Sequence, residues 1–105
     1  DARWTVVKQH PVTAGIEQGK TMFHSYYDHI ELENGPQGAV LATGDKTGKP
    51  VVVAGAYGKG RYLACGMIVG VSQDDKPTPL TNGERILIQN AVKWCGRQSA
   101  DPGNR

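Results

Sequence analysis

The fold is decided by one stretch of the chain, residues 50–67, which has the sequence PVVVAGAYGKGRYLACGM. Residues 50–56 are a nearly continuous apolar run, which is typical of a strand covered on both faces. Gly58 and Gly60 are free to adopt positive φ angles, and the apolar pattern resumes over residues 61–67. This pattern predicts a β-hairpin at the centre of the domain.

Three further stretches predict other strands. Residues 4–7 are β-branched and aromatic and end shortly before Pro11, so they predict a short first strand. Residues 26–32 predict a second strand, although their apolar alternation is imperfect. Residues 39–43 predict a compact apolar strand, which the turn signal at residues 44–48 joins to the next strand as a hairpin.

A helix is predicted over residues 82–95. Thr81 and Glu84 have the spacing of a capping box, and Gly96 is placed to end the helix. Apolar residues recur at three- and four-residue spacing, which indicates one face packed on a sheet. These apolar residues are Leu87, Ile88, Ala91, Val92, Trp94 and Cys95. The predicted core comprises Val51, Val53, Leu63, Cys65, Leu87, Ala91 and Trp94.

The length of 105 residues fits one small domain. We expect residues 1–97 to form this domain and residues 98–105, which are small, polar and Pro/Gly-bearing, to form a flexible tail. The chain begins at Asp1 without an initiator Met or an apolar leader. We therefore expect a processed product or a piece of a longer gene. Nothing in the sequence indicates a cellular compartment.

Charge and hydropathy exclude two classes of partner. The 12 Lys and Arg residues are interspersed with 10 Asp and Glu residues, giving a net charge of +2, so no basic stripe for nucleic acid is predicted. The longest apolar runs, residues 51–56 and 63–71, are far shorter than the roughly 20 residues of a membrane span. We expect neither nucleic acid nor a membrane as a partner.

No metal site or cofactor is predicted. The five-residue spacing of His24 and His29 puts their side chains on opposite faces of a strand, and about 140° apart on a helix. Around Lys59 and Arg61, the sequence lacks the four residues between glycines and the following Lys-Ser/Thr of a phosphate-binding loop.

No catalytic residue is predicted either. Ser25, Ser72 and Ser99 lack a Gly-x-Ser-x-Gly elbow, and burial in an apolar strand would raise the pKa of the Cys65 thiol. Cys65 and Cys95 are compatible with a disulfide or with two buried thiols, and we favour the thiols.

Several short motifs, taken in order, resemble the C-terminal half of ThuA-like domains, which belong to the class I glutamine amidotransferase-like set. The motifs are HPVTAGI at residues 10–16, VLAT at 40–43, PVVV at 50–53, YGKGR at 57–61 and NAVKW at 90–94. The resemblance covers about residues 4–96. It implies an α/β fold, with a short mixed β-sheet, a central hairpin and a C-terminal amphipathic helix, like the C-terminal half of a flavodoxin-like domain.

The same resemblance implies that the chemistry lies elsewhere. It implies an N-terminal half before Asp1, with a parallel sheet and the turn where amidotransferases place their cysteine nucleophile. Many relatives have an acidic residue before the hairpin and a Gly-His pair after it, whereas this chain has Ala56 and Gly66-Met67. Both polar positions are apolar here.

The main hypothesis is a non-catalytic scaffold or a ligand- or partner-binding module of a larger bacterial protein, related to carbohydrate use. The predicted contacts for a small-molecule or sugar ligand are His10, Tyr57, Lys59 and Arg61. One helix covers only one face of a sheet, so residues 51–56 also require a second cover. This cover would be the upstream half-domain, a partner chain or a self-association interface.

Two alternatives remain open. The first is a fragment or subunit of a sugar-processing or amidotransferase-like enzyme whose nucleophile belongs to the missing half. In this case His10 would lie near the active cleft, and Tyr26 or Asp28 would supply polar groups. The second alternative is a purely structural dimerisation unit.

Overall fold

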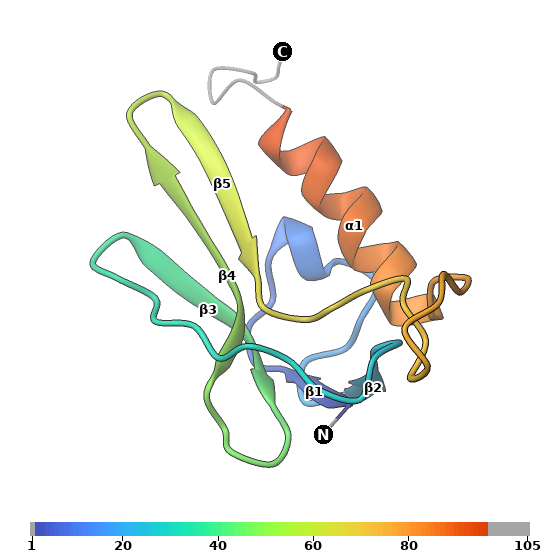
Figure 1. The fold of residues 1–105 in the computed structure, drawn as a ribbon. Coiled ribbons are helices and arrows are strands. Elements are labelled where there is room, and N and C mark those ends of the chain that lie inside the picture. The colour runs from blue at the N-terminus through green and yellow to red at the C-terminus, as the bar shows by residue number, and fades with distance from the viewer. Residues whose placement is uncertain (1, 97–105) are drawn as a thin grey trace.

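The structure, a computed structural model, describes residues 2–96, so the predicted tail at residues 98–105 lies outside the described residues. One five-stranded sheet packs against one α-helix (Figure 1). In chain order the elements are β1 (Arg3–Val6), the short 3-10 helix η1 (Pro11–Thr13), β2 (Thr21–Phe23), β3 (Gly38–Gly44), β4 (Pro50–Tyr57), β5 (Gly60–Cys65) and α1 (Asn82–Cys95).

The sheet has the order β2-β1-β3-β4-β5, and every neighbouring pair is antiparallel. The prediction of an α/β fold with a mixed sheet, like half of a flavodoxin-like domain, is therefore wrong, because flavodoxin-like sheets are parallel. The fold is an antiparallel α+β arrangement. Its physical reason lies in the connections: residues 45–49 and residues 58–59 are too short for the crossover of a dozen or more residues that parallel neighbours require.

The central hairpin and the helix are confirmed. In the β4–β5 turn, Gly58 has a φ angle of 59°, in the left-handed region that favours glycine. Thr81 and Glu84 form both hydrogen bonds of the predicted capping box at the start of α1. The predicted apolar stripe is narrower than expected: Leu87 and Ala91 are buried, whereas Val92 is 69% exposed.

The predicted strand at residues 26–32 is wrong. Residues 24–37, here called the strap, form an irregular connection between β2 and β3 (Figure 1), with backbone hydrogen bonds from Ile30 N to Gly66 O and from Leu32 N to Pro50 O. The apolar residues of this stretch do not alternate regularly, so a strand would have no single apolar face to bury. Ile30, which a strand would have buried, is 65% exposed. The strand in this part of the chain is the short β2, which lies just before the predicted stretch.

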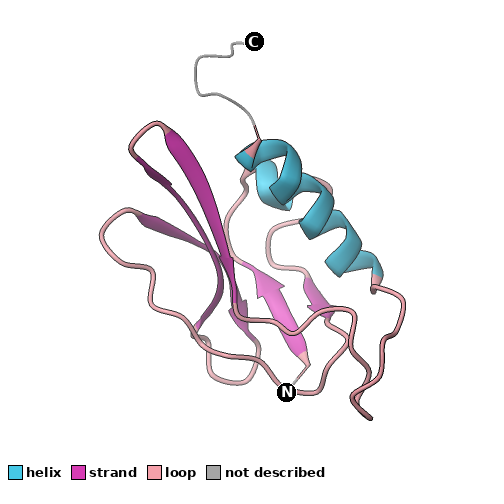
Figure 2. Cartoon of the chain, turned by 45° about the horizontal axis from the view of Figure 1, so that its top comes forward, coloured by secondary structure: helices cyan, strands magenta, loops and turns pink. Residues whose placement is uncertain are grey.

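Both faces of β4 are covered, as its sequence predicts. Residues 51–54 are buried in succession. On one face, Val52 and Ala54 share a core cluster with Leu87 of α1, and the helix lies along the sheet (Figure 2). On the other face lies the strap, since an added Cβ on Gly38 would meet both Asn34 and Val53. The chain thus supplies the second cover itself, while an external partner remains a prediction.

The predicted core is correct for Val51 and Val53, as it is for the helix residues Leu87 and Ala91. Leu63 and Trp94 are half-buried and pack against this core, and the prediction is wrong for Cys65, which is exposed. Cys65 is the last residue of β5, the strand at the edge of the sheet, where no further strand of residues 2–96 lies beside it. Within residues 2–96, no helix has the length and hydropathy needed to cross a bilayer.

Candidate functional site

Two of the four predicted ligand contacts meet at the end of α1. The ring centroids of His10 and Trp94 lie 4.7 Å apart in an edge-to-face arrangement, and the Arg61 guanidinium carbon lies 5.0 Å from the centroid of the Trp94 ring. The other two contacts, Tyr57 and Lys59, are exposed at the tip of the β4–β5 hairpin. The structure therefore places His10 and Arg61 together, with the hairpin tip adjoining Arg61 in sequence.

Arg61 is held in place by the last turn of the helix. Its register partner on β4 is Ala56, and its Nη1 donates a hydrogen bond to the Trp94 carbonyl oxygen at 3.0 Å. A cation is favourable at a helix C-terminus, where backbone carbonyls lack intrahelical partners, and over an indole ring. Arg61 thus links the edge strand to α1 through one side chain.

His10 has a structural task of its own. Its Nδ1 accepts a hydrogen bond from Val12 N at 3.0 Å and so caps η1. The neutral imidazole therefore carries its proton on Nε2. Desolvation, followed by the positive charges of Lys8 and Arg61, lowers the pKa of His10. We call the group formed by Lys8, His10, Arg61 and Trp94 the Trp94 cluster; its charges at neutral pH are positive.

Sequence reasoning found two members of this cluster and missed two. Trp94 was assigned to the core because it continues the apolar stripe of the helix. It lies in the last turn of α1, and it is only half-buried. Lys8 was overlooked, although its position two residues before His10 was a visible signal.

A second cluster joins two histidines that the spacing argument had separated. Nε2 of His24 and Nδ1 of His29 are 3.1 Å apart, and the two ring centroids are 5.3 Å apart. The irregular backbone of the strap brings them together, which neither a strand nor a helix would do. His24 is 3% exposed, and its Nδ1 has no hydrogen-bond partner. The two rings bond to each other, and residues 2–96 hold no group of three or more His, Cys, Asp or Glu side chains suited to a metal ion.

The buried position of His24 beside His29 makes the free energy of unfolding depend on pH. Desolvation, followed by the nearby His29, lowers the pKa of His24 below its ordinary value of 6.5, and Glu84 opposes the shift. The unfolded chain therefore binds more protons than the folded chain as the pH falls below 6.5. We expect the free energy of unfolding, measured with urea, to be highest above pH 6.5 and to decrease between pH 6.5 and 5.

Two variants isolate this effect. His10 shifts in the same direction, so its titration must be removed separately. His10→Asn keeps a side-chain acceptor for the η1 cap, and it should retain most of the decrease in unfolding free energy between pH 6.5 and 5. His24→Gln should lose part of this decrease. An unchanged pH dependence in His24→Gln would show that the buried histidine is not responsible.

One buried carboxylate connects three segments of the chain. Glu84 accepts hydrogen bonds from Thr81 N at 2.9 Å, from Ser25 N at 2.6 Å and from Ser25 Oγ at 2.5 Å. Ser25 Oγ in turn accepts one from Gly70 N at 3.2 Å. The helix start, the strap and the segment after β5 therefore meet at one group. The capping box was visible in the sequence, but no local signal pairs residue 84 with residue 25.

The nucleophile candidates within residues 2–96 are engaged in hydrogen bonds or have a raised pKa; Ser72 Oγ donates to the Asp74 carboxylate, and Ser99 lies outside the described residues. Ser25 Oγ uses its proton on the Glu84 carboxylate. Part of the Cys65 side chain is accessible, yet desolvation raises the pKa of its thiol, and Sγ donates toward the Met67 carbonyl oxygen. Cys65 and Cys95 are both free thiols, as favoured, but neither is buried as predicted: Cys65 is exposed and Cys95 is half-buried. Tyr26 donates its phenol proton to Asp75 at 2.8 Å, and hydrogen bonds with Tyr27 and Asp75 raise its pKa.

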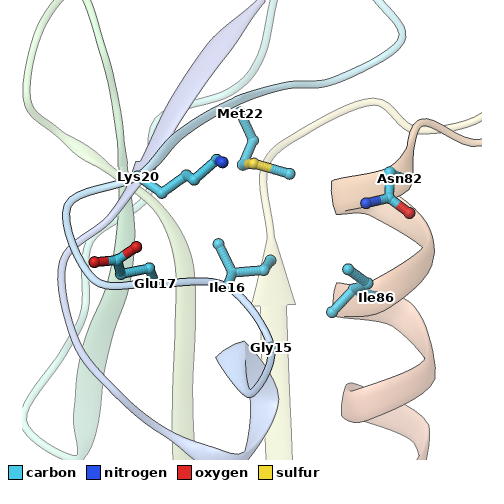
Figure 3. Close-up of a pocket in the computed structure, with 7 residues that line it drawn as sticks. All are labelled: Gly15, Ile16, Glu17, Lys20, Met22, Asn82 and Ile86. Carbon is cyan, nitrogen blue, oxygen red and sulfur yellow. The ribbon is translucent and has the colours of Figure 1, made fainter.

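Two hollows in the structure are small. One of about 220 Å³ lies between residues 15–22 and α1, with Ile16, Lys20 and Met22 on one side and Asn82 and Ile86 on the other (Figure 3). The second, of about 290 Å³, is lined by Asp28, His29, Glu31, Lys46 and Thr47. Pockets for small molecules usually enclose about 300–1,000 Å³. Asp28 lines the second hollow, whereas none of the four predicted ligand contacts lines either.

Comparison with models of protein families, with curated proteins and with solved structures finds no match for this chain. The function is therefore argued from the geometry alone.

Proposed function

We propose that this chain is a non-catalytic binding module of a larger protein, and that its binding surface consists of the β4–β5 hairpin tip and the Trp94 cluster. The observation that carries the proposal is the exposure of Tyr57, which reaches 85% at the end of a strand that is buried over residues 51–54 and becomes exposed from Ala56 onward. An aromatic ring on a loop or turn that a folded scaffold positions is well placed to contact a ligand or partner.

The surface is suited to an anionic ligand. Lys59 and Arg61 are the only charged residues between residues 50 and 73, and no acidic residue occurs between residues 46 and 73. Lys8 and Arg61 both lower the pKa of His10; Lys8 lies two residues before His10 in the chain, and Arg61 contacts the same Trp94 ring as His10. The proposed ligand therefore carries carboxylate groups, either as a sugar acid or as acidic side chains of a partner.

The surface is also rigidly supported. Residues 51–54 anchor β4 between α1 and the strap, and Arg61 is bonded to the Trp94 carbonyl oxygen. Binding residues on a fixed frame lose less conformational entropy when a ligand arrives. The absence of catalysis is supported by the engagement of His10 Nδ1 as a cap and of Ser25 Oγ with Glu84.

The test uses two carboxylate probes, an oligogalacturonate and an acetylated acidic peptide of sequence TVEVEVT, each titrated into the protein by calorimetry. We expect Tyr57→Ala to weaken binding of the active probe by about tenfold, because an exposed aromatic anchor is lost. The unfolding free energy should change by less than about 0.5 kcal/mol, since Tyr57 is largely exposed.

Tyr27→Ala is the matched control, because Tyr27 is also exposed but lies in the strap. It should leave the affinity unchanged. The proposal fails if neither probe binds, or if Tyr57→Ala and Tyr27→Ala bind equally well.

A further inference from the structure

The outer edge of β5 is open. β5 is the last strand of the sheet, and it pairs with β4 from Tyr57↔Gly60 to Val52↔Cys65. The hydrogen bond from Gly66 N to Val51 O shows that Gly66 and Val51 form a hydrogen-bonded pair, which decides which β5 residues bond to β4. In an antiparallel pair, hydrogen-bonded and non-hydrogen-bonded positions alternate. The backbone N–H and C=O groups of Arg61, Leu63 and Cys65 therefore point away from β4, and no other part of residues 2–96 bonds to them.

This edge lacks the usual protection against strand pairing. Proteins blunt an exposed edge with proline, a bulge, a very short strand or a charge along the edge. β5 has six residues and no proline, and the register shifts of the sheet lie between β3 and β4. Its one charged side chain, Arg61, lies at the start of the strand beside the hairpin tip and contacts Trp94 of α1, so the edge from Tyr62 to Cys65 carries no charged side chain. At the opposite edge, β2 has three residues, and Thr81 Oγ donates to its Phe23 carbonyl oxygen.

The charges beside the open edge select its occupant. Lys59 lies at the hairpin tip, Arg61 begins the open part of the edge, and Lys8 lies near His10 in the same cluster. The absence of acidic residues from 46 to 73 leaves these charges without acidic neighbours in the hairpin sequence. An extended segment that pairs with β5 would therefore be favoured by acidic side chains.

We propose that the outer edge of β5 binds an extended acidic segment of a partner polypeptide, which adds a sixth strand to the sheet. Main-chain hydrogen bonds to Arg61, Leu63 and Cys65 supply affinity, and acidic side chains near Lys59 and Arg61 supply specificity. This inference rests on the proposed function, because it names the class of partner that the same surface recognises.

Amide hydrogen exchange of the intact chain tests the geometry directly. In the free protein, the amides of Arg61, Leu63 and Cys65 should exchange faster than those of Tyr62 and Ala64. Saturation with the TVEVEVT peptide should slow the first three by about tenfold and leave the other two unchanged. The peptide TVKVKVT is the charge control and should bind about tenfold more weakly.

Two variants at one position test the strand pairing. Leu63→Pro removes an outward-pointing N–H, and it costs no ladder bond because proline is tolerated on the open side of an edge strand. Leu63→Ala loses the same side-chain packing but keeps the N–H. We expect the peptide to bind Leu63→Ala and to bind Leu63→Pro at least about tenfold more weakly. The exchange experiment on the unaltered chain decides the question if Leu63→Pro does not fold.

The outcomes separate this inference from the proposed function. If Tyr57→Ala weakens peptide binding but Leu63→Pro binds as Leu63→Ala does, the module stands and strand addition is wrong. Strand addition is also wrong if only the oligogalacturonate binds, if TVKVKVT binds equally, or if sedimentation shows β5 engaged in a dimer that Leu63→Pro dissolves. If no probe binds, both proposals fall.

Discussion

Gly66→Ala is expected to lower the free energy of unfolding by about 3 kcal/mol. A Cβ atom at this position would lie 1.9 Å from the Ile30 carbonyl oxygen and 2.9 Å from its carbon. Both are main-chain atoms, so the clash cannot be relieved by a rotamer change. The strap would have to lift from the sheet and would lose the bond from Ile30 N to Gly66 O, which measures 2.8 Å. Urea unfolding followed by tryptophan fluorescence measures the change.

Gly60→Ala is the matched control for this variant. Neither glycine has a positive φ angle, so an alanine is compatible with the backbone at both positions. At Gly60 the nearest atom to an added Cβ is the Tyr57 carbonyl oxygen at 3.6 Å, an ordinary contact. Its effect should stay within about 0.5 kcal/mol. Equal stability of the two variants would contradict the close packing of the strap on Gly66.

Glu84→Ala is expected to destabilise the fold by about 3 kcal/mol or more. The substitution removes the acceptor for Ser25 N, Ser25 Oγ and Thr81 N at a site where Glu84 is fully buried. It leaves donors without partners, and each unsatisfied buried donor costs about 1–3 kcal/mol. Glu84→Gln should cost less, because the amide keeps the size of the side chain and one acceptor oxygen.

The control for Glu84 is Glu17→Ala, since Glu17 is exposed in the loop before β2. It should change the unfolding free energy by less than about 0.5 kcal/mol. Thermal unfolding of the four proteins should rank Glu17→Ala with the unaltered chain, then Glu84→Gln, then Glu84→Ala. A Glu84→Ala variant as stable as Glu17→Ala would show that the carboxylate does not hold the three segments together.

The elements that the sequence predicted correctly depend on neighbouring residues. The turn at Gly58 and the capping box of Thr81 and Glu84 are both set within a few positions. The antiparallel pairing of β3, β4 and β5 was also implied by the short connections at residues 45–49 and 58–59, whereas the longer connections on either side of β2 do not fix its direction. The error of a mixed, flavodoxin-like sheet came from extending a resemblance to topology instead of following the connection lengths.

The features that escaped prediction depend on residues far apart in the chain. Four consecutive buried residues in β4 indicated two covers, and the second cover was sought outside the chain. The strap has no periodic pattern, so nothing in its own sequence showed that it lies on Val53. The hydrogen bond between Ser25 and Glu84 likewise joins residues far apart in the chain, so no local pattern indicated it. Of the candidate site, His10 and Arg61 were found by residue type, whereas Trp94 required knowing where the sheet ends.

The meeting of Ser25 and Glu84 has a consequence for biosynthesis. The ribosome releases residue 84 after the strap and both strands of the central hairpin have emerged. Until then Ser25 lacks its acceptor, and the β4 face that packs on α1 stays exposed to solvent or to factors that bind nascent chains. A chain truncated before residue 84 would have a sheet whose apolar face is not covered by α1. Such an intermediate is prone to aggregate or to bind a chaperone.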